Sequence, residues 1–205
     1  MTQTSRPVRC LFYSHVWVVH MLKQAGLGAF DQQQVLIELA ENSHLAAVFG
    51  EQGKPRFGIA GLLRLSGRLD SLVQTFKNVP SPLVLAPRPA MPAAMLNSAV
   101  GLLASTPAPY ETATLLIHVE DAPLFAGCYA QVNEFSVLWD VLDPPSPALV
   151  AMAQTLADQQ VITQHTWRGF HLYRHPNRNS PDAVDRMQQF KTILQDYPLL
   201  TGQAA

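Results

Sequence analysis

Charged side chains are scarce in this sequence. Asp, Glu, Lys and Arg together make up 14% of the 205 residues, against about 25% in a typical soluble domain. Because charge normally covers a protein's surface, much of this surface must consist of small polar and apolar side chains. Such a surface suits docking to another protein, and it equally suits a globular protein without a partner. The formal net charge of −1 argues against a protein whose main task is to grip nucleic acid or an anionic membrane.

Cysteine is scarce as well. Cys10 and Cys128 are the only two, and they form no CxxC motif. Two cysteines complete neither a zinc site nor a disulfide framework, which favours a reducing compartment. The sequence has no run of about 18 uninterrupted apolar residues, and its apolar N-terminal stretch lacks a clean signal-peptide cleavage site. We therefore expect a cytoplasmic protein without a membrane span.

Short motifs that bind phosphates or carry a catalytic nucleophile are missing. Neither GxGxxG, GxxxxGK[ST] nor GxSxG occurs anywhere in the chain. Ordinary turns explain the glycine pairs Gly26/Gly28 and Gly58/Gly61. The sequence therefore indicates no cofactor and no resident metal ion, and it leans away from an enzyme.

The first half of the chain is predicted to be mixed in structure. Asp31 to Phe49 is expected to be a helix, because Asp31 and Gln34 have the spacing of a capping box and an apolar stripe follows. His44 would lie near the C-terminal end of that helix. Residues 7–22 fit a buried strand running into a helix, and their periodicity does not separate strand from helix. The other expected elements are a strand at Arg56–Leu65, a helix at Leu69–Lys77, an extended edge segment at Leu83–Ala86 and a helix at Ala93–Ala104.

The second half is predicted to be richer in strands. Thr112–Val119, Phe125–Val132 and Phe135–Val141 are expected to form antiparallel strands at about 112–142. Ser146-Pro147 and Ser180-Pro181 each predict a helix start, since a capping hydroxyl precedes a proline at the first helical position.

Histidine, arginine and aromatic side chains are most concentrated in residues 161–178, which have no carboxylate. A hairpin turning at Arg168-Gly169 sorts these side chains into an apolar and a polar face, because Gly169 tolerates the positive φ of a tight turn. The expected fold is therefore mixed α+β, with a C-terminal helix-hairpin-helix at about 146–197. We expect a single compact domain over residues 1–205, with the proline-rich stretch 79–109 as the place where it would divide.

The hairpin also supplies the predicted binding residues. Arginines hold phosphates and aromatic side chains stack on bases or pack at interfaces, so a mixture of the two indicates a contact surface. The histidines lack a carboxylate or cysteine partner within the stretch, so a metal site is not expected. The predicted binding residues are Trp167, Arg168, Phe170, His171, Tyr173, Arg174, His175 and Arg178.

Three functional hypotheses follow. The leading one is a non-enzymatic subunit or adaptor of a multiprotein assembly, which docks through its low-charge surface and the C-terminal hairpin onto a protein partner or a second copy. The first alternative is a nucleic-acid-binding component that uses the arginines and aromatics of 161–178. The second is an enzyme of unidentified type that uses His171 or His175. His118, Glu120 and Asp121 at a strand end are interpreted as an exposed strand terminus.

Overall fold

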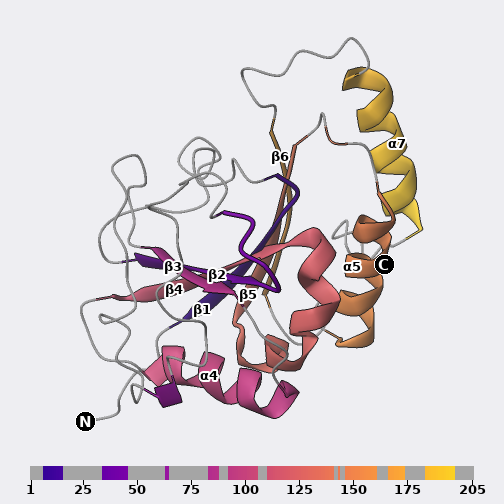
Figure 1. Ribbon diagram of the computed structural model, residues 1–205. Helices are drawn as coiled ribbons and strands as arrows, with labels where there is room; N and C mark the ends of the chain where they lie inside the picture. Colours follow the sequence, from indigo (N-terminus) through magenta and orange to yellow (C-terminus); the bar gives the residue numbers. More distant parts are fainter. Residues whose placement is uncertain are drawn as a thin grey trace.

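The computed structural model describes residues 7–15, 34–45, 63–64, 83–87, 92–105, 110–140, 143, 146–160, 166–173 and 183–196, and the statements below concern these residues. They form one six-stranded sheet with helices packed against it (Figure 1). The strands are β1 (Val8–Tyr13), β2 (Gln34–Ala40), β3 (Leu83–Pro87), β4 (Thr112–His118), β5 (Glu134–Asp140) and β6 (Thr166–Tyr173).

Every neighbouring pair of strands in this sheet is parallel. The strand order is β3-β2-β4-β1-β5-β6. The predicted antiparallel set at 112–142 is therefore wrong, because β4 and β5 are separated by β1 and run in the same direction. The α+β class fails with it, since a parallel sheet with intervening helices is an α/β arrangement.

Helices cover one face of the sheet. They are α4 (Ala93–Ser105), the 3₁₀ segment η3 (Val119–Gln131) and α5 (Pro147–Asp158), and η3 contacts both α4 and α5. A further helix, α7 (Ala183–Gln195), follows β6. Alternate strand residues such as Cys10, Ile37 and Leu115 pack into one apolar core with the helices. The intervening strand residues, such as Leu11 and Leu116, are also buried, so the central strands are buried on both faces.

Burial on both faces explains the wrong helix at Asp31–Phe49, where the structure has strand β2. All seven residues of β2 are buried. Such a strand reads as a continuous apolar run without alternation, and Val35, Leu36 and Leu39 happen to fit helical spacing. The side chain of Glu38, the charged residue within β2, is also inside the protein.

The predicted strand at Phe125–Val132 is also wrong, because these residues belong mostly to η3. Its buried side chains Val119, Ala122, Phe125 and Cys128 recur every three residues. A 3₁₀ helix has three residues per turn, so this spacing aligns them on one face. A strand would require a spacing of two.

The predicted hairpin at Arg168-Gly169 does not form. β6 is a single strand parallel to β5, with one extra residue between the partners of Phe135 and Val137. Gly169 sits at this irregularity with φ +84°, as a bulge often requires. The extra residue brings Trp167 and Phe170 to the same side, where both pack against the core. Because Trp167 and Phe170 are three residues apart, they do not fit the alternation of a regular strand, and a hairpin sorted the side chains better. The predicted helix-hairpin-helix at about 146–197 is therefore wrong.

Other elements were predicted correctly. The structure confirms strands at β3, β4 and β5, the helix α4, and the start of α5, where Ser146 is the N-cap and Pro147 the first helical residue. It shows that Val8–Tyr13, where the sequence left strand and helix open, is the strand β1. Most of Arg56–Leu65, all of Leu69–Lys77 and the helix start at Ser180-Pro181 lie outside the described residues. The single-domain organisation, with its alternative division at 79–109, stays a prediction. No helix within the described ranges is both long and apolar enough to cross a membrane.

The contact between α4 and η3 predicts an asymmetric response to two glycine substitutions. A Cβ added at Gly127 would lie 2.6 Å from the Cβ of Ala93, whereas one at Gly101 would meet only the end of the Gln131 side chain at 3.4 Å. Gly127→Ala should therefore destabilise the fold by about 1–3 kcal/mol. Gly101→Ala should stabilise it by up to about 1 kcal/mol, because alanine is the better helix former. Urea unfolding of both variants checks this, and equal midpoints would contradict it.

Candidate functional site

The order of the strands reverses between β1 and β4. These two strands are neighbours, yet the chain passes from β1 to β2 on the β4 side, and from β4 to β5 on the β1 side. In open parallel sheets, ligands bind outside the carboxyl ends of the strands at such a reversal. We therefore expect a ligand site at the carboxyl ends of β1 and β4.

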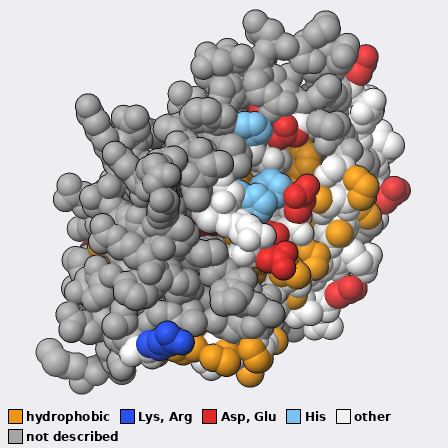
Figure 2. Space-filling view, in the orientation of Figure 1, with side chains coloured by type: hydrophobic (Ala, Val, Ile, Leu, Met, Phe, Trp, Pro, Cys, Tyr) orange, Lys and Arg blue, Asp and Glu red, His pale blue; other side chains and the backbone are white. Residues whose placement is uncertain are grey.

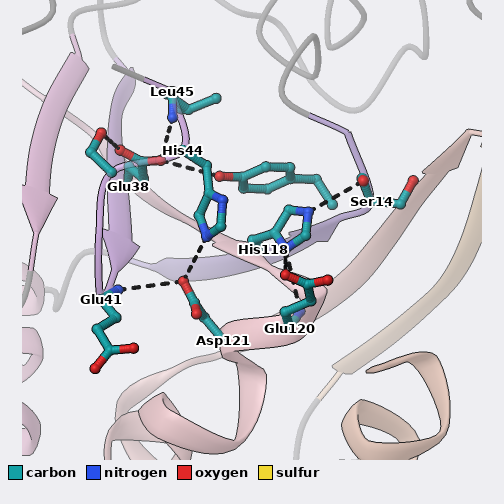
Figure 3. Close-up of polar contacts among 10 residues, drawn as sticks. Ser14, Glu38, Glu41, His44, Leu45, His118, Glu120 and Asp121 are labelled. Carbon is teal, nitrogen blue, oxygen red and sulfur yellow. Dashed lines mark hydrogen bonds and ion pairs between the residues drawn. The ribbon is translucent and has the colours of Figure 1, made fainter. Parts of the chain in front are cut away.

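Polar side chains from three strands meet at this point (Figure 3). Ser14 follows β1, His44 lies in the loop after β2, and His118 ends β4. Glu120 and Asp121 open η3 directly after β4. We call these five residues the β1–β4 edge. They come from positions up to 107 residues apart (121 − 14) in the sequence, and the parallel strands bring them together.

His44 and Asp121 form the closest ion pair of this edge. The Nε2 atom of His44 lies 3.0 Å from Oδ2 of Asp121, which also accepts a hydrogen bond from the backbone N–H of Glu41. The hydrogen bond with Asp121 raises the pKa of His44, and the negative charge of Asp121 adds to this, although partial burial of the ring opposes it. A charge-assisted hydrogen bond of this kind favours the imidazolium form.

His118 stacks on His44, and its surroundings favour the neutral ring. The two ring centroids lie 4.4 Å apart with an interplanar angle of 22°. The Nδ1 atom of His118 accepts from the backbone N–H of Glu120, and Nε2 lies 3.3 Å from the carbonyl oxygen of Ser14. This pattern suits the neutral ring with its proton on Nε2. Burial lowers the pKa of His118, and the charge of His44 lowers it further.

Glu38 holds the loop that carries His44. Its buried carboxylate accepts hydrogen bonds from the Tyr13 hydroxyl, the Ser43 hydroxyl and the backbone N–H of Leu45. Burial raises the pKa of Glu38, while these three bonds oppose the rise. Because Ser43 and Leu45 flank His44, the carboxylate of Glu38 fixes the loop that carries the His44 ring.

Ser14 links the end of β1 to the end of β5. Its hydroxyl donates to Oδ2 of Asp143 at 2.8 Å and accepts from the backbone N–H of Asp140 at 2.9 Å. The serine is therefore committed to two partners, and it is a structural tie more than an activated nucleophile.

The charge near the β1–β4 edge is mainly negative. Figure 2 shows histidine side chains at the surface with acidic side chains beside them, while the Lys and Arg side chains in view lie apart at the lower edge. Arg9 and Arg168 pair with Glu134, at the amino end of β5. Within the described ranges, no group of three His, Cys, Asp or Glu residues could hold a metal ion.

The residues predicted to bind from the sequence lie elsewhere. Trp167 and Phe170 pack against each other with ring centroids 5.7 Å apart. The Nε atom of Arg168 lies 3.1 Å from Oε2 of Glu134. His171 is on β6, where burial lowers its pKa, and its Nε2 meets no hydrogen-bond partner among the described residues. Tyr173 ends β6, and Arg174, His175 and Arg178 lie outside the described residues. Binding by this set stays a prediction.

Sequence reasoning missed most of this site. His118, Glu120 and Asp121 were interpreted as an exposed strand terminus, which is wrong for Asp121 because it is buried. Their partner His44 was assigned to a helix. A correct strand at β2 would have placed His44 just past a carboxyl end, beside those residues. The histidines next to these carboxylates are His44 and His118, and neither was among the predicted binding residues.

Comparison with known proteins supports the fold. No protein-family model and no curated protein matches the sequence. Among solved structures, the chain is similar to cobyrinic acid a,c-diamide synthase from Mycobacterium smegmatis with a bound ATP analogue and magnesium. That likeness has a TM-score of 0.63 at 13% identity, over 90% of this chain and 82% of that one.

Two further solved structures agree. The MinC:MinD cell division complex of Aquifex aeolicus has a TM-score of 0.59 at 12% identity, over 92% of this chain and 77% of that one. A ParA family ATPase from Chlorobium tepidum has a TM-score of 0.55 at 12% identity, over 97% of this chain and 96% of that one. The described strands and helices thus have a fold similar to that of these three proteins.

This fold corrects the functional hypotheses. The non-enzymatic adaptor was inferred from the low charge, the proline-rich loops and the missing catalytic signature, but the fold is similar to that of an ATPase and of a synthase. The assignment as a complex subunit has no support from these likenesses. The nucleic-acid alternative depended on the hairpin at 161–178, which the parallel strand β6 replaces in part. The alternative enzyme that uses His171 or His175 stays a prediction, and His175 lies outside the described residues.

The two stacked histidines are expected to titrate apart. NMR of the imidazole protons should give His44 a pKa above, and His118 a pKa below, the ordinary value of about 6.5. Because the folded pKa of His44 is raised, its pair with Asp121 adds stability below the unfolded pKa, and this contribution is lost as pH rises through the folded pKa. Asp121→Asn should lower the pKa of His44, and an unchanged midpoint in that variant would contradict the pairing.

Proposed function

We propose that this chain binds a nucleotide at the β1–β4 edge. The observation that carries the proposal is the reversal of strand order between β1 and β4, with the side chains of Ser14, His44 and His118 gathered there. A reversal in a parallel sheet creates a ligand site through topology alone. Residue identities at the edge then decide which ligand is held.

The likeness to nucleotide-bound proteins supports this ligand class. The cobyrinic acid a,c-diamide synthase of M. smegmatis was solved with an ATP analogue and magnesium, and also with ADP and magnesium. Our chain differs from a P-loop protein in one respect, because GxxxxGK[ST] is missing from its sequence. Phosphate contacts in this chain would therefore differ from those of the GxxxxGK[ST] loop.

A protein partner and a cytoplasmic location are further parts of this proposal. MinD of A. aeolicus was solved in a complex with MinC, which supports a partner protein for a chain of the same fold. The reducing compartment inferred from the two cysteines, which are both buried and free, supports the cytoplasm.

Blocking the β1–β4 edge should weaken nucleotide binding. Calorimetric titration with ATP and ADP, each with and without magnesium, measures the affinity. Glu120, whose side chain is 66% exposed, lies just past the carboxyl end of β4, so Glu120→Trp should obstruct the ligand and weaken binding about tenfold, or about 1.4 kcal/mol.

The opposite end of the same strand supplies the matched control. Glu111 is exposed and precedes the first residue of β4, so Glu111→Trp adds the same bulk at the amino edge and should leave the affinity unchanged. Absence of binding by the unsubstituted chain, or equal weakening by both variants, would refute a nucleotide site at the carboxyl edge.

A further inference from the structure

We propose that protonated His44 donates a hydrogen bond to a phosphate oxygen of the bound ligand, and that Asp121, Glu38 and His118 hold it in position for this contact. The inference rests on the nucleotide site proposed above and names the residue that takes over phosphate recognition at the β1–β4 edge. It makes ligand binding depend on the protonation of a single imidazole.

The geometry leaves one ring nitrogen of His44 available. Nε2 is engaged by Asp121 at 3.0 Å, whereas Nδ1 has no hydrogen bond with any of the described residues. The side chain of His44 is 27% exposed, and that of Asp121 is 11% exposed. A protonated ring therefore presents its Nδ1–H as a charged donor while Asp121 holds the opposite nitrogen. Hydrogen bonds from charged donors to phosphate are among the stronger ones in proteins.

The rings around His44 restrict its motion. His118 stacks against it at 4.4 Å, and Tyr13 packs edge-on against His118 with ring centroids 5.3 Å apart (Figure 3). Glu38 fixes the loop on both sides of His44 through Ser43 and Leu45. A donor that is held in place loses less conformational entropy when the ligand arrives. Glu38 is thus a positioning residue, which acts through the loop.

The charges facing His44 make phosphate binding depend on whether His44 is protonated. Strand β2 contributes Glu38 and the loop after it Glu41, η3 contributes Glu120 and Asp121, β4 contributes the His118 ring, and β1 contributes Tyr13. The carboxylates among these groups would repel a phosphate when His44 is neutral. Protonation supplies both the positive charge and the donor hydrogen. Anion binding and proton binding at His44 should therefore favour each other.

Linkage gives this coupling a measurable form. If only the protonated form binds, affinity is constant below the pKa of His44 and falls about tenfold per pH unit above it. The ligand must also raise the pKa of His44 by the same coupling, because linkage between two binding events is reciprocal. The second effect is observable on the unsubstituted protein by NMR, so the proposal can be tested even if a variant does not fold.

The experiment is a calorimetric titration with ADP and with inorganic pyrophosphate between about pH 5.5 and 8.5, where a histidine changes charge. The unsubstituted chain should lose affinity as the pH rises. His44→Gln should bind about tenfold more weakly at low pH and lose the pH dependence that the histidine causes. Titration of the ligand's own phosphate is common to both chains, so the difference between them isolates His44. Asp121→Asn should move the loss of affinity to lower pH.

Glu111→Gln is the matched control. Glu111 is exposed and precedes the first residue of β4, at the opposite edge of the sheet, and its replacement should change neither the affinity nor its pH dependence.

The outcomes separate the two proposals. Nucleotide binding with the same pH dependence in His44→Gln, and no change in the pKa of His44 on ligand addition, would overturn the role of His44 and leave the nucleotide site standing. No binding of either probe at any pH would overturn both. Binding that follows the His44 pKa, with loss of that dependence in His44→Gln alone, would support both.

Discussion

The common direction of the strands is the constraint on which the rest of the structure depends. When neighbouring strands are parallel, their carboxyl ends meet at one edge of the sheet, and residues far apart in the sequence become neighbours there. Ser14, His44 and His118 each lie at or just past such an end. Had β4 run antiparallel to β1, His118 would lie at the opposite edge from Ser14. The polar cluster thus follows from strand direction together with strand order.

A buried carboxylate in the middle of a sheet is costly unless its oxygens are satisfied. Glu38 meets this requirement with three donors, two of which belong to the loop that carries His44. The same bonds that make burial of Glu38 tolerable therefore order the loop. Replacing Glu38 by an apolar residue would remove the burial cost and would also release Ser43 and Leu45. Glu38 therefore affects both the stability of the fold and the position of His44, so a measurement of stability alone does not report its effect on the site.

The sequence predicted elements better than it predicted their assembly. The helices α4 and α5 and the strands β3, β4 and β5 follow from local patterns, such as the proline after Ser146. Strand β2 did not, because a run buried on both faces has no alternation, and its apolar residues also fit a helix. That single error moved His44 from a strand end to a helix end and hid the site. The direction of pairing between strands leaves no local signal, so the parallel sheet had to come from the structure.

The missing phosphate loop limits how much the fold alone can explain. In P-loop proteins, backbone N–H groups and a lysine meet the phosphates, and the topology only places them. Here the same topology places two histidines and several carboxylates at the corresponding edge. An imidazole differs from a lysine because its charge changes near neutral pH, so a site built on it binds conditionally. A lysine would hold the phosphate at every physiological pH, whereas His44 links binding to the proton concentration and to the carboxylate of Asp121 that sustains its charge.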